Sequence, residues 1–302
     1  MGDTHFLLDK IRKLSQGTTR HKFEGVFTLK GERMNPADVR RASSAMLKKA
    51  RELGATLAGF ALAEDLKAAP SFTFAPQMPG AGQGVGTREN ELGLKPGLVA
   101  WPEGACSLMI IAIDHPADKP EMDWWFGRVD PPGNRILARV VRELVEWIEA
   151  TYPIRTVHLP YHVEKGGTYL KDAAVLAGLG CIGKNNILVT PEYGPRVRLR
   201  ALTLDVAIPS TGPTGFDPCR QCDSPCRRAC PQTAFARRLY ESKDYGQDRL
   251  PGRSGVYSRP ACNIQMEADN SDAAEQSVDG FNDPVKVIKY CRGCELSCPV
   301  GA

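Results

Sequence analysis

Eight cysteines in the last third of the chain have the residue type and spacing of ligands for iron-sulfur clusters. Seven lie in two segments, CRQCDSPCRRACP and CRGCELSCP, and Cys262 lies alone between them in RPACNIQ. A cysteine at every third or fourth position, closing with Cys-Pro, allows short loops to surround a cluster of iron and sulfide with thiolates. The chemistry that these residues predict is the transfer of single electrons.

The spacing also predicts how the thiolates are shared between clusters. In two-cluster bacterial ferredoxins the cysteine before proline ligates the other cluster. One predicted ligand set is therefore Cys219, Cys222, Cys226 and Cys298. The other set is Cys230, Cys291, Cys294 and, because Ile288 stands where a complete second motif would begin, Cys262. The sequence thus predicts two 4Fe-4S clusters.

Two other uses of these cysteines stay open at this stage. Four-cysteine zinc sites are usually built from paired Cys-x-x-Cys units, and disulfide frameworks are typical of small secreted chains. The first motif also places three residues, Asp223 to Pro225, where the usual cluster motif has two. The run of four cysteines that ends in Cys-Pro nevertheless favours clusters over both alternatives.

The composition indicates an ordinary globular protein of one large and one small domain. The 302 residues are 42% hydrophobic, and the net charge of +4 is spread along the chain. No stretch approaches the roughly 20 consecutive apolar residues of a membrane span. The first residues, MGDTHFLLDKIRKLSQ, lack an apolar core and a twin arginine before one, so we expect a cytoplasmic protein with no membrane partner.

Helices and strands alternate before the cysteine segments, which predicts an α/β or α+β fold. A helix is expected from Asn35-Pro36 to Gly54, and apolar strands at 55–62 and 105–114. Asn134 is expected to cap a helix that runs to about Ala150. The stretch IPSTGPTG marks a boundary, so we expect domains at 1–210 and 211–302.

The middle of the chain predicts a glycine-rich turn between short elements. Strands are expected at 156–159 and 187–190, and Thr168 is expected to cap a helix that ends at Gly178 or Gly180. Residues 196–206 alternate arginine with apolar residues, which predicts a strand with one basic face. The aromatic residues at 124–126 could line a ligand pocket or close the edge of a core.

The segment AGLGCIGKNNILVTPEYG, together with the order of the cysteines, resembles the epoxyqueuosine reductase and reductive dehalogenase superfamily. The resemblance extends from Ala105 to the end of the chain. It implies a nitroreductase-like mixed sheet with helices, followed by a ferredoxin-like domain with two clusters. It also implies a base-off cobalamin, and the sequence has no Asp-x-His-x-x-Gly pattern that would supply a lower cobalt ligand.

The resemblance further implies which residues face the cofactor and the substrate. Gly183, Lys184 and Asn185 match a corrinoid-contacting loop, and Asn263 lies near the cofactor. Counting back from AGLG places Glu164 as the proton donor, although a solvated carboxylate at that position is an equally good reading. The rival donors, beside Lys165, are Tyr161 and Tyr169.

The function expected from the resemblance is a reductase that removes oxygen or halide from a small substrate. It would receive electrons from a low-potential donor of ferredoxin or flavodoxin type. A tRNA substrate is only weakly supported, because no helical repeat tail follows Cys298. The alternatives are a non-catalytic corrinoid and iron-sulfur electron-transfer protein, and a plain ferredoxin fused to an unrelated domain. Of the remaining cysteines, Cys106 is expected to be buried in its strand and Cys181 to be packed or to face the cofactor.

Overall fold

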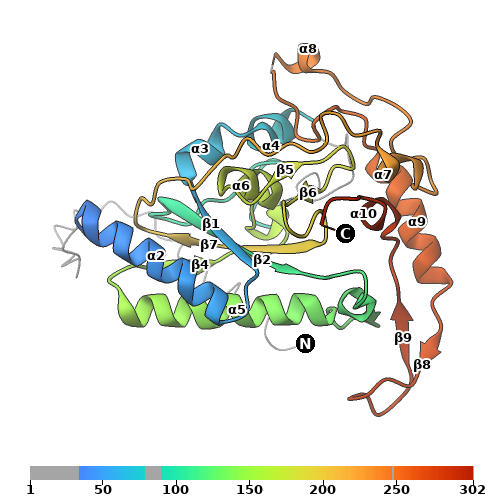
Figure 1. The fold of residues 1–302 in the computed structure, drawn as a ribbon, viewed down its shortest axis with the longest axis horizontal. Coiled ribbons are helices and arrows are strands. Elements are labelled where there is room, and N and C mark those ends of the chain that lie inside the picture. Colours follow the sequence, from blue (N-terminus) through green and yellow to red (C-terminus); the bar gives the residue numbers. More distant parts are fainter. Residues whose placement is uncertain (1–33, 79–89, 247, 302) are drawn as a thin grey trace. The chain divides into compact units, whose positions relative to one another are not determined.

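The computed structural model describes residues 34–78, 90–246 and 248–301. Residues 34–302 form a single compact unit, which Figure 1 shows as a ribbon. The expectation of a start without a leader concerns residues that lie outside the described part. Within the described part, no helix has the length and apolar character needed to cross a membrane.

A four-stranded sheet forms the centre of the unit. Its strands, in spatial order, are β1 (Leu57–Leu62), β2 (Ser107–Asp114), β7 (Val197–Leu204) and β4 (Thr156–His158). Seven of the eight residues of β2 are buried, because helices cover both faces of the sheet at this strand. This double burial explains why β2 appears in the sequence as a continuous apolar run instead of an alternating one.

Every pairing in this sheet is antiparallel, so the mixed sheet that the resemblance implied is not seen among these strands. The reason lies in the connection from β2 to β4. Both strands run antiparallel to β7 and hence parallel to each other, and the helix α5 (Pro132–Thr151) lies in the crossover between them. The two parallel strands β2 and β4 are not neighbours, because β7 lies between them and pairs antiparallel with both. This is the split form of a β-α-β unit.

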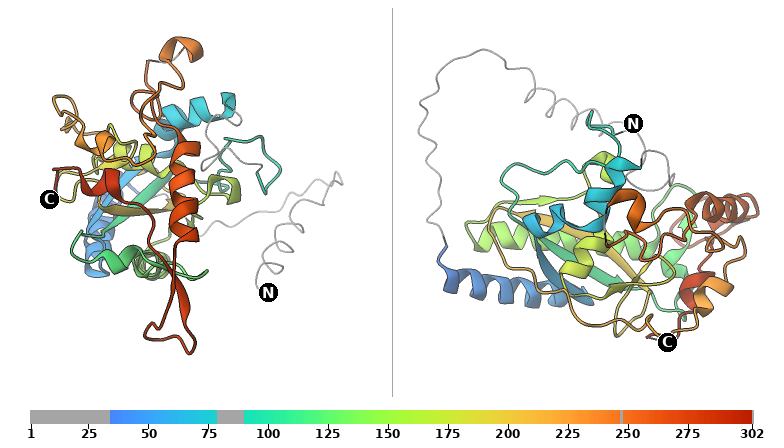
Figure 2. Two further views of the ribbon diagram at one scale, coloured as in Figure 1. Left: turned by 90° about the vertical axis from the view of Figure 1, so that its right-hand side faces the viewer. Right: turned by 90° about the horizontal axis from the view of Figure 1, so that it is seen from above.

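Two layers of helices enclose the sheet. On one face, α2 (Pro36–Glu52) and α5 pack against Met109, Ile111 and Leu202. On the other face, α3 (Ala63–Lys67) and α6 (Leu170–Leu176) pack against the alternate residues of the same strands, as Figures 1 and 2 show. The predicted α/β class is therefore confirmed as a mixture of helices and antiparallel sheets.

Of the three helix caps predicted from the sequence, one is confirmed and two are wrong. Asn35 caps α2 by accepting hydrogen bonds from the amides of Ala37 and Asp38, as predicted. Asn134 lies inside α5, because that helix already begins at Pro132, and its side chain accepts from Arg198 instead. Thr168 lies two residues before α6, with a buried hydroxyl outside the N-cap position.

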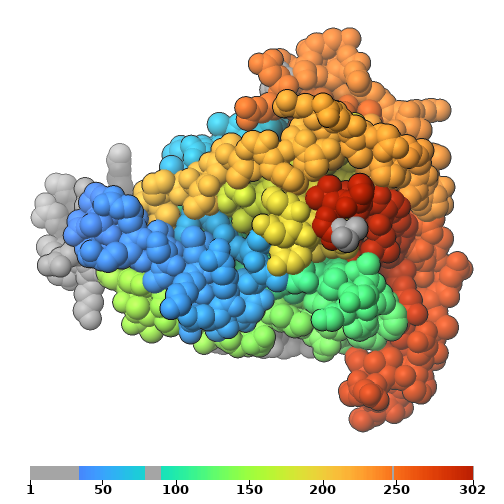
Figure 3. Space-filling model, in the orientation of Figure 1, coloured from blue at the N-terminus to red at the C-terminus, as the bar shows by residue number. Residues whose placement is uncertain are grey.

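The last part of the chain contains helices joined by turns, which are α7 (Pro225–Arg228), α8 (Ser242–Tyr245), α9 (Arg259–Ser271) and α10 (Gly293–Leu296). Cys226 lies on α7, Cys262 on α9 and Cys294 on α10, and the other cluster cysteines lie in the turns. Strands β3 (Trp125–Phe126), β9 (Val285–Ile288) and β8 (Glu275–Gln276) form a small separate sheet. The last residues before the C-terminus lie beside residues near 120 and near 195, as Figure 3 shows. The predicted boundary at residue 210 and the ferredoxin-like character of this part stay predictions.

Candidate iron-sulfur and reductase site

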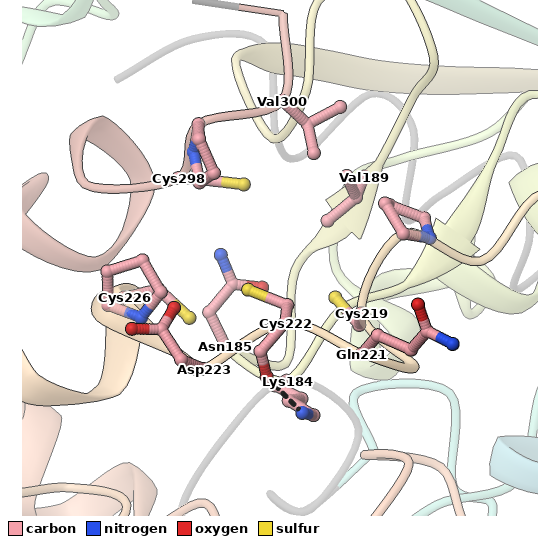
Figure 4. A pocket seen from close by; sticks show the side chains of 13 residues that line it. Lys184, Asn185, Val189, Cys219, Gln221, Cys222, Asp223, Cys226, Cys298 and Val300 are labelled. Atoms are coloured by element: carbon pink, nitrogen blue, oxygen red, sulfur yellow. Dashed lines mark hydrogen bonds between the residues drawn. The ribbon is translucent and has the colours of Figure 1, made fainter.

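Four cysteines from two distant segments line one pocket. The pocket has a volume of about 470 Å³, and its walls include Cys219, Cys222, Cys226 and Cys298. Figure 4 shows these four side chains around a common space. They are the four residues that the sequence predicts for the first cluster, which we call the first thiol set.

Turns at the start of α7 bring the first three of these cysteines together. The Asp217 carboxylate accepts a hydrogen bond from the Cys219 amide at 3.2 Å, which fixes the first turn. Ser224 has φ 64°, in the left-handed region, and directly precedes α7, on which Cys226 lies. The additional residue of the first motif is therefore absorbed by a tight reversal of the chain at Ser224.

The remaining cluster cysteines form a second group, which we call the second thiol set. It consists of Cys230, Cys262, Cys291 and Cys294. Cys294 lies close enough to the other three thiols for their charges to raise its pKa. The isolated Cys262 reaches this group because α9 runs beside the segment that leads into α10. The structure thus brings together both predicted groups of four, while the ligation of clusters by them stays a prediction.

Burial and the repulsion between neighbouring thiolates disfavour the ionised form of the cysteines in both sets. Burial, followed by the charges of neighbouring thiols, raises the pKa of Cys294 to about 12. The same two causes raise the pKa values of Cys226 and Cys298, and burial followed by the charge of Asp269 raises the pKa of Cys291. Thiolates held in such a group require compensating positive charge, which the iron of a cluster supplies. The donor set and the shared cavity therefore fit an iron-sulfur cluster.

All ten cysteines of the chain lie in the described residues, and all are free thiols. Across residues 34–78, 90–246 and 248–301, no three histidine, cysteine or acidic side chains are grouped to hold a single metal ion.

The loop at residues 183–185, which we call the GKN loop, holds both cysteine segments. The Lys184 ammonium donates to the carbonyl of Cys222 at 2.6 Å, and the Asn185 amide donates to the carbonyl of Cys294 at 3.3 Å. Asn185 is only 2% exposed and also lines the first pocket. One loop is therefore anchored to the first thiol set through one residue and to the second through the next.

Gly183 is required by the packing of this same loop. A Cβ atom at Gly183 would lie 2.5 Å from Oδ1 of Asn185 and 2.6 Å from Cγ2 of Val189. Contacts that short do not occur, so a side chain would displace the Asn185 amide. The residues predicted to contact a corrinoid thus have an observed structural role, and their contact with a corrinoid stays a prediction. Asn263 lies on α9 and is partly exposed.

Two arginines near the C-terminal cysteines, one buried and one partly buried, could not be assigned a role from the sequence. Arg196, 5% exposed, donates to the carbonyls of Cys298 and Val300. Arg292 donates to the carbonyl of His115 at 2.7 Å and pairs with Asp123 at 2.6 Å. The only sequence signal for Arg196 was the alternation of arginine with apolar residues around β7. Arg292 had no sequence signal beyond its position between two cysteines.

The proposed proton donors differ in how they are shielded from water. Glu164 lies in the turn η3 (Val163–Lys165) and is 6% exposed, with its Oε1 3.5 Å from Nδ1 of His162. Tyr161 is 47% exposed, and its ring lies 5.0 Å from the Arg200 guanidinium. The alternative of a solvated carboxylate at Glu164 is therefore wrong, because the side chain is buried.

Tyr169 and Lys165 complete this group of candidates. The Tyr169 hydroxyl donates to the carbonyl of Gly97 at 2.8 Å. Burial, assisted by the charges of Asp172 and Glu164, raises its pKa. Lys165 is exposed and lies 3.4 Å from Glu91. None of Tyr161, Glu164 and Tyr169 is among the residues that line the cysteine pocket.

Two further expectations concern residues outside the two thiol sets. Cys106 is exposed, not buried, because β2 begins only at the following residue. The aromatic residues of the loop before α5 pack on the small sheet and its surroundings, since Trp125 contacts Tyr290 and Phe126 contacts Phe281. This contact favours the core-edge reading of these aromatics.

Comparison with known proteins places this geometry in context. The chain matches no protein-family model. It is 38% identical over 99 residues to a protein of Gloeobacter violaceus named epoxyqueuosine reductase, a match that covers 32% of this chain and 30% of the relative. The matched part thus spans about a third of that relative.

Solved structures share the fold. One is an epoxyqueuosine reductase with a modified tRNA-Tyr stem loop, with a TM-score of 0.54, 17% identity, and coverage of 87% of this chain and 66% of that one. Another is the catabolic reductive dehalogenase NpRdhA in complex with 3-bromo-4-hydroxybenzoic acid, with a TM-score of 0.54 and 18% identity, covering 85% of this chain and 31% of that one. The resemblance predicted from the sequence is confirmed.

Proposed function

We propose that this chain is an oxidoreductase of the epoxyqueuosine reductase and reductive dehalogenase type, with two 4Fe-4S clusters held by the two thiol sets. The names of the relatives support the class of enzyme. The observation that carries the proposal is the convergence of eight cysteines from three separate segments into two groups of four, one of which surrounds a cavity. A plain ferredoxin would need neither the GKN loop nor the isolated Cys262.

A base-off cobalamin is the second cofactor that we propose, on the strength of the sequence resemblance. When bound, a corrinoid and the clusters would together supply the low-potential electrons for reductive removal of oxygen or halide. Electrons would come from a donor of ferredoxin or flavodoxin type. The substrate that we propose is a small organic molecule or a modified nucleoside. Because one structural neighbour is an epoxyqueuosine reductase with a modified tRNA stem loop, the proposal includes a nucleoside within tRNA.

The protein's own residues would position the cofactors and supply a proton. Lys184 and Asn185 fix the two cysteine segments relative to the loop between them. Arg196 fixes the chain directly after Cys298. Glu164, shielded from water, would donate a proton to the substrate, as a general acid does. Tyr161, the alternative donor, is less shielded.

Three measurements on anaerobically reconstituted protein test this proposal. Iron and acid-labile sulfide should each amount to about eight atoms per chain. Hydroxocobalamin should elute with the protein from a sizing column. Turnover should then be assayed with epoxyqueuosine nucleoside, with an epoxyqueuosine-containing tRNA stem loop and with an aryl halide.

The outcomes separate the candidate functions. Turnover of one substrate supports the enzyme and names the substrate class. Cobalamin binding without any turnover favours the non-catalytic electron-transfer protein. A colourless protein that binds zinc, or one whose thiols are paired, would refute the proposal.

A further inference from the structure

We infer that the charges around the two thiol sets make a cluster held by the first set easier to reduce than one held by the second. This inference rests on the proposed function, since it assumes that both sets hold clusters. It concerns the protein residues around each set and what they do to the energy of an added electron. Net charge near a cluster and hydrogen bonds to its sulfurs are among the factors that set its reduction potential.

Three cations without a carboxylate partner among the described residues lie beside the first thiol set. Lys184 donates to the Cys222 carbonyl at 2.6 Å, and Arg196 donates to the carbonyls of Cys298 and Val300. Arg227 directly follows Cys226 and donates only to uncharged oxygens, those of Lys184 and Ser254. Asp223, which directly follows Cys222, lies near Lys184 but is paired with Arg228 at 2.8 Å, so this carboxylate leaves the excess of three positive charges at the first set in place.

A fourth cation at the first set is neutralised. Arg253 donates to the Asp217 carboxylate at 2.8 Å and to the carbonyl of Ile182 at 3.2 Å. Asp217 in turn accepts from the Cys219 amide. The Arg253–Asp217 pair orders the first turn of the cysteine loop while adding little net charge.

The second thiol set has carboxylates at positions comparable to those of Asp217 and Asp223 at the first set, but it has fewer cations. Asp269 accepts a hydrogen bond from the Cys291 amide at 2.7 Å, and Glu295 directly follows Cys294. The two cations of this set are Arg292, which pairs with Asp123 and Glu295, and Arg259, which lies near Cys262. Positive and negative charges are therefore balanced at the second set, whereas they are not at the first.

Hydrogen bonds to sulfur do not distinguish the two sets. At the first set the donors are the amides of Ser224, at 3.4 Å, and of Arg227 and Val300. At the second set they are the amides of Ala234 and Gly293, at 3.3 and 3.4 Å, and the hydroxyl of Tyr257. Because the numbers of donors are equal, the difference in full charges decides the order.

The physical consequence follows from the sign of the charge. A cluster with four thiolate ligands becomes more negative by one unit on reduction, so nearby cations stabilise the reduced form and carboxylates destabilise it. An electron shared between the two sets would reside mainly at the first. This set is also the one that opens into the 470 Å³ pocket, whose walls include Lys184 and Asn185.

The test is a redox titration of the anaerobically reconstituted full chain, followed by electron paramagnetic resonance. Two couples are expected, and Cys262→Ser, which removes a ligand of the second set alone, should abolish the lower one. Lys184→Met should lower the ratio of reduced to oxidised form of the upper couple about tenfold at a fixed potential, a shift of 59 mV for one electron. Asp269→Asn should raise the lower couple instead, and Lys243→Met, on an exposed side chain of α8, should change neither.

Results that overturn the inference differ from those that overturn the proposed function. If no iron is incorporated, the proposed function fails. If eight irons are present but Cys262→Ser abolishes the upper couple, or Lys184→Met shifts the lower one, only the order of the two sets is wrong. Should Lys184→Met fail to assemble, the Cys262→Ser titration of the remaining cluster still decides the order.

Discussion

Replacing Asn185 by leucine should destabilise the protein and loosen both thiol sets at once. The side chain is almost fully buried, donates to the Cys294 carbonyl at 3.3 Å and accepts from the Ile187 amide at 3.3 Å. Leucine has a similar shape but no polar atoms, so the variant leaves one partly buried carbonyl and one partly buried amide without partners. Each such group costs roughly 1 to 3 kcal/mol, which makes roughly 2 to 6 kcal/mol for the two. Because both hydrogen bonds are long and partly exposed, we expect a loss of about 2 kcal/mol in the free energy of unfolding, the lower end for the two groups together.

The assay is urea unfolding of the anaerobically reconstituted protein. Tryptophan fluorescence reports the fold, and visible absorbance reports the clusters. Both midpoints should move to lower urea, and iron per chain should fall after gel filtration. Asn282→Leu, at an exposed position of the β8–β9 hairpin, serves as the matched control and should unfold like the wild type.

A second variant tests the same reasoning through a neighbour. Gly183→Ala adds one methyl group that would meet the Asn185 amide oxygen at 2.5 Å, and it should reproduce the loss without altering Asn185 itself. If Asn185→Leu unfolds at the same urea concentration as the wild type and retains its iron, the loop does not hold the cysteine segments and the reasoning is refuted.

Three further predictions concern cluster content, catalysis and pH. Cys262→Ser should reduce iron from about eight to about four atoms per chain, while Cys106→Ser, at an exposed thiol, should leave it unchanged; equal iron in both variants would remove Cys262 from the ligand set. Glu164→Gln should lower turnover of the substrate identified above about a hundredfold with cobalamin still bound, and unchanged turnover would exclude this proton donor. Burial lowers the pKa of Lys171 from 10.5 to about 8, so the folded chain releases this proton before the unfolded chain does. The free energy of unfolding of the wild type, measured by urea titration, should therefore rise by up to about 3 kcal/mol between pH 8 and pH 10.5 relative to that of Lys171→Met. If the free energies of the two proteins change in parallel over this pH range, Lys171 is not a buried cation.

Local sequence determined the helices, strands and cysteine motifs because each depends on neighbouring residues. Asn35 and Pro36 start α2 through hydrogen bonds that span three residues, and the apolar run of β2 needs no distant information. The pairing of β7 between β2 and β4 could not be predicted in this way. It depends on a crossover through α5, and the sequence signals of a parallel and a split arrangement are the same.

The cysteine spacing alone divided eight thiols into two groups, because loop geometry limits which sulfurs can share a cluster. Tertiary structure was needed to bring Cys262 on α9 to the second thiol set and to assign Lys184 and Asn185 to the carbonyls of Cys222 and Cys294. It also revealed that Arg196 contacts the first set at Cys298 and that Asp269 contacts the second set at Cys291, although each residue is distant in the sequence from the cysteine that it contacts. Charges act through space, so the electrostatic difference between the two sets exists only once the chain has folded.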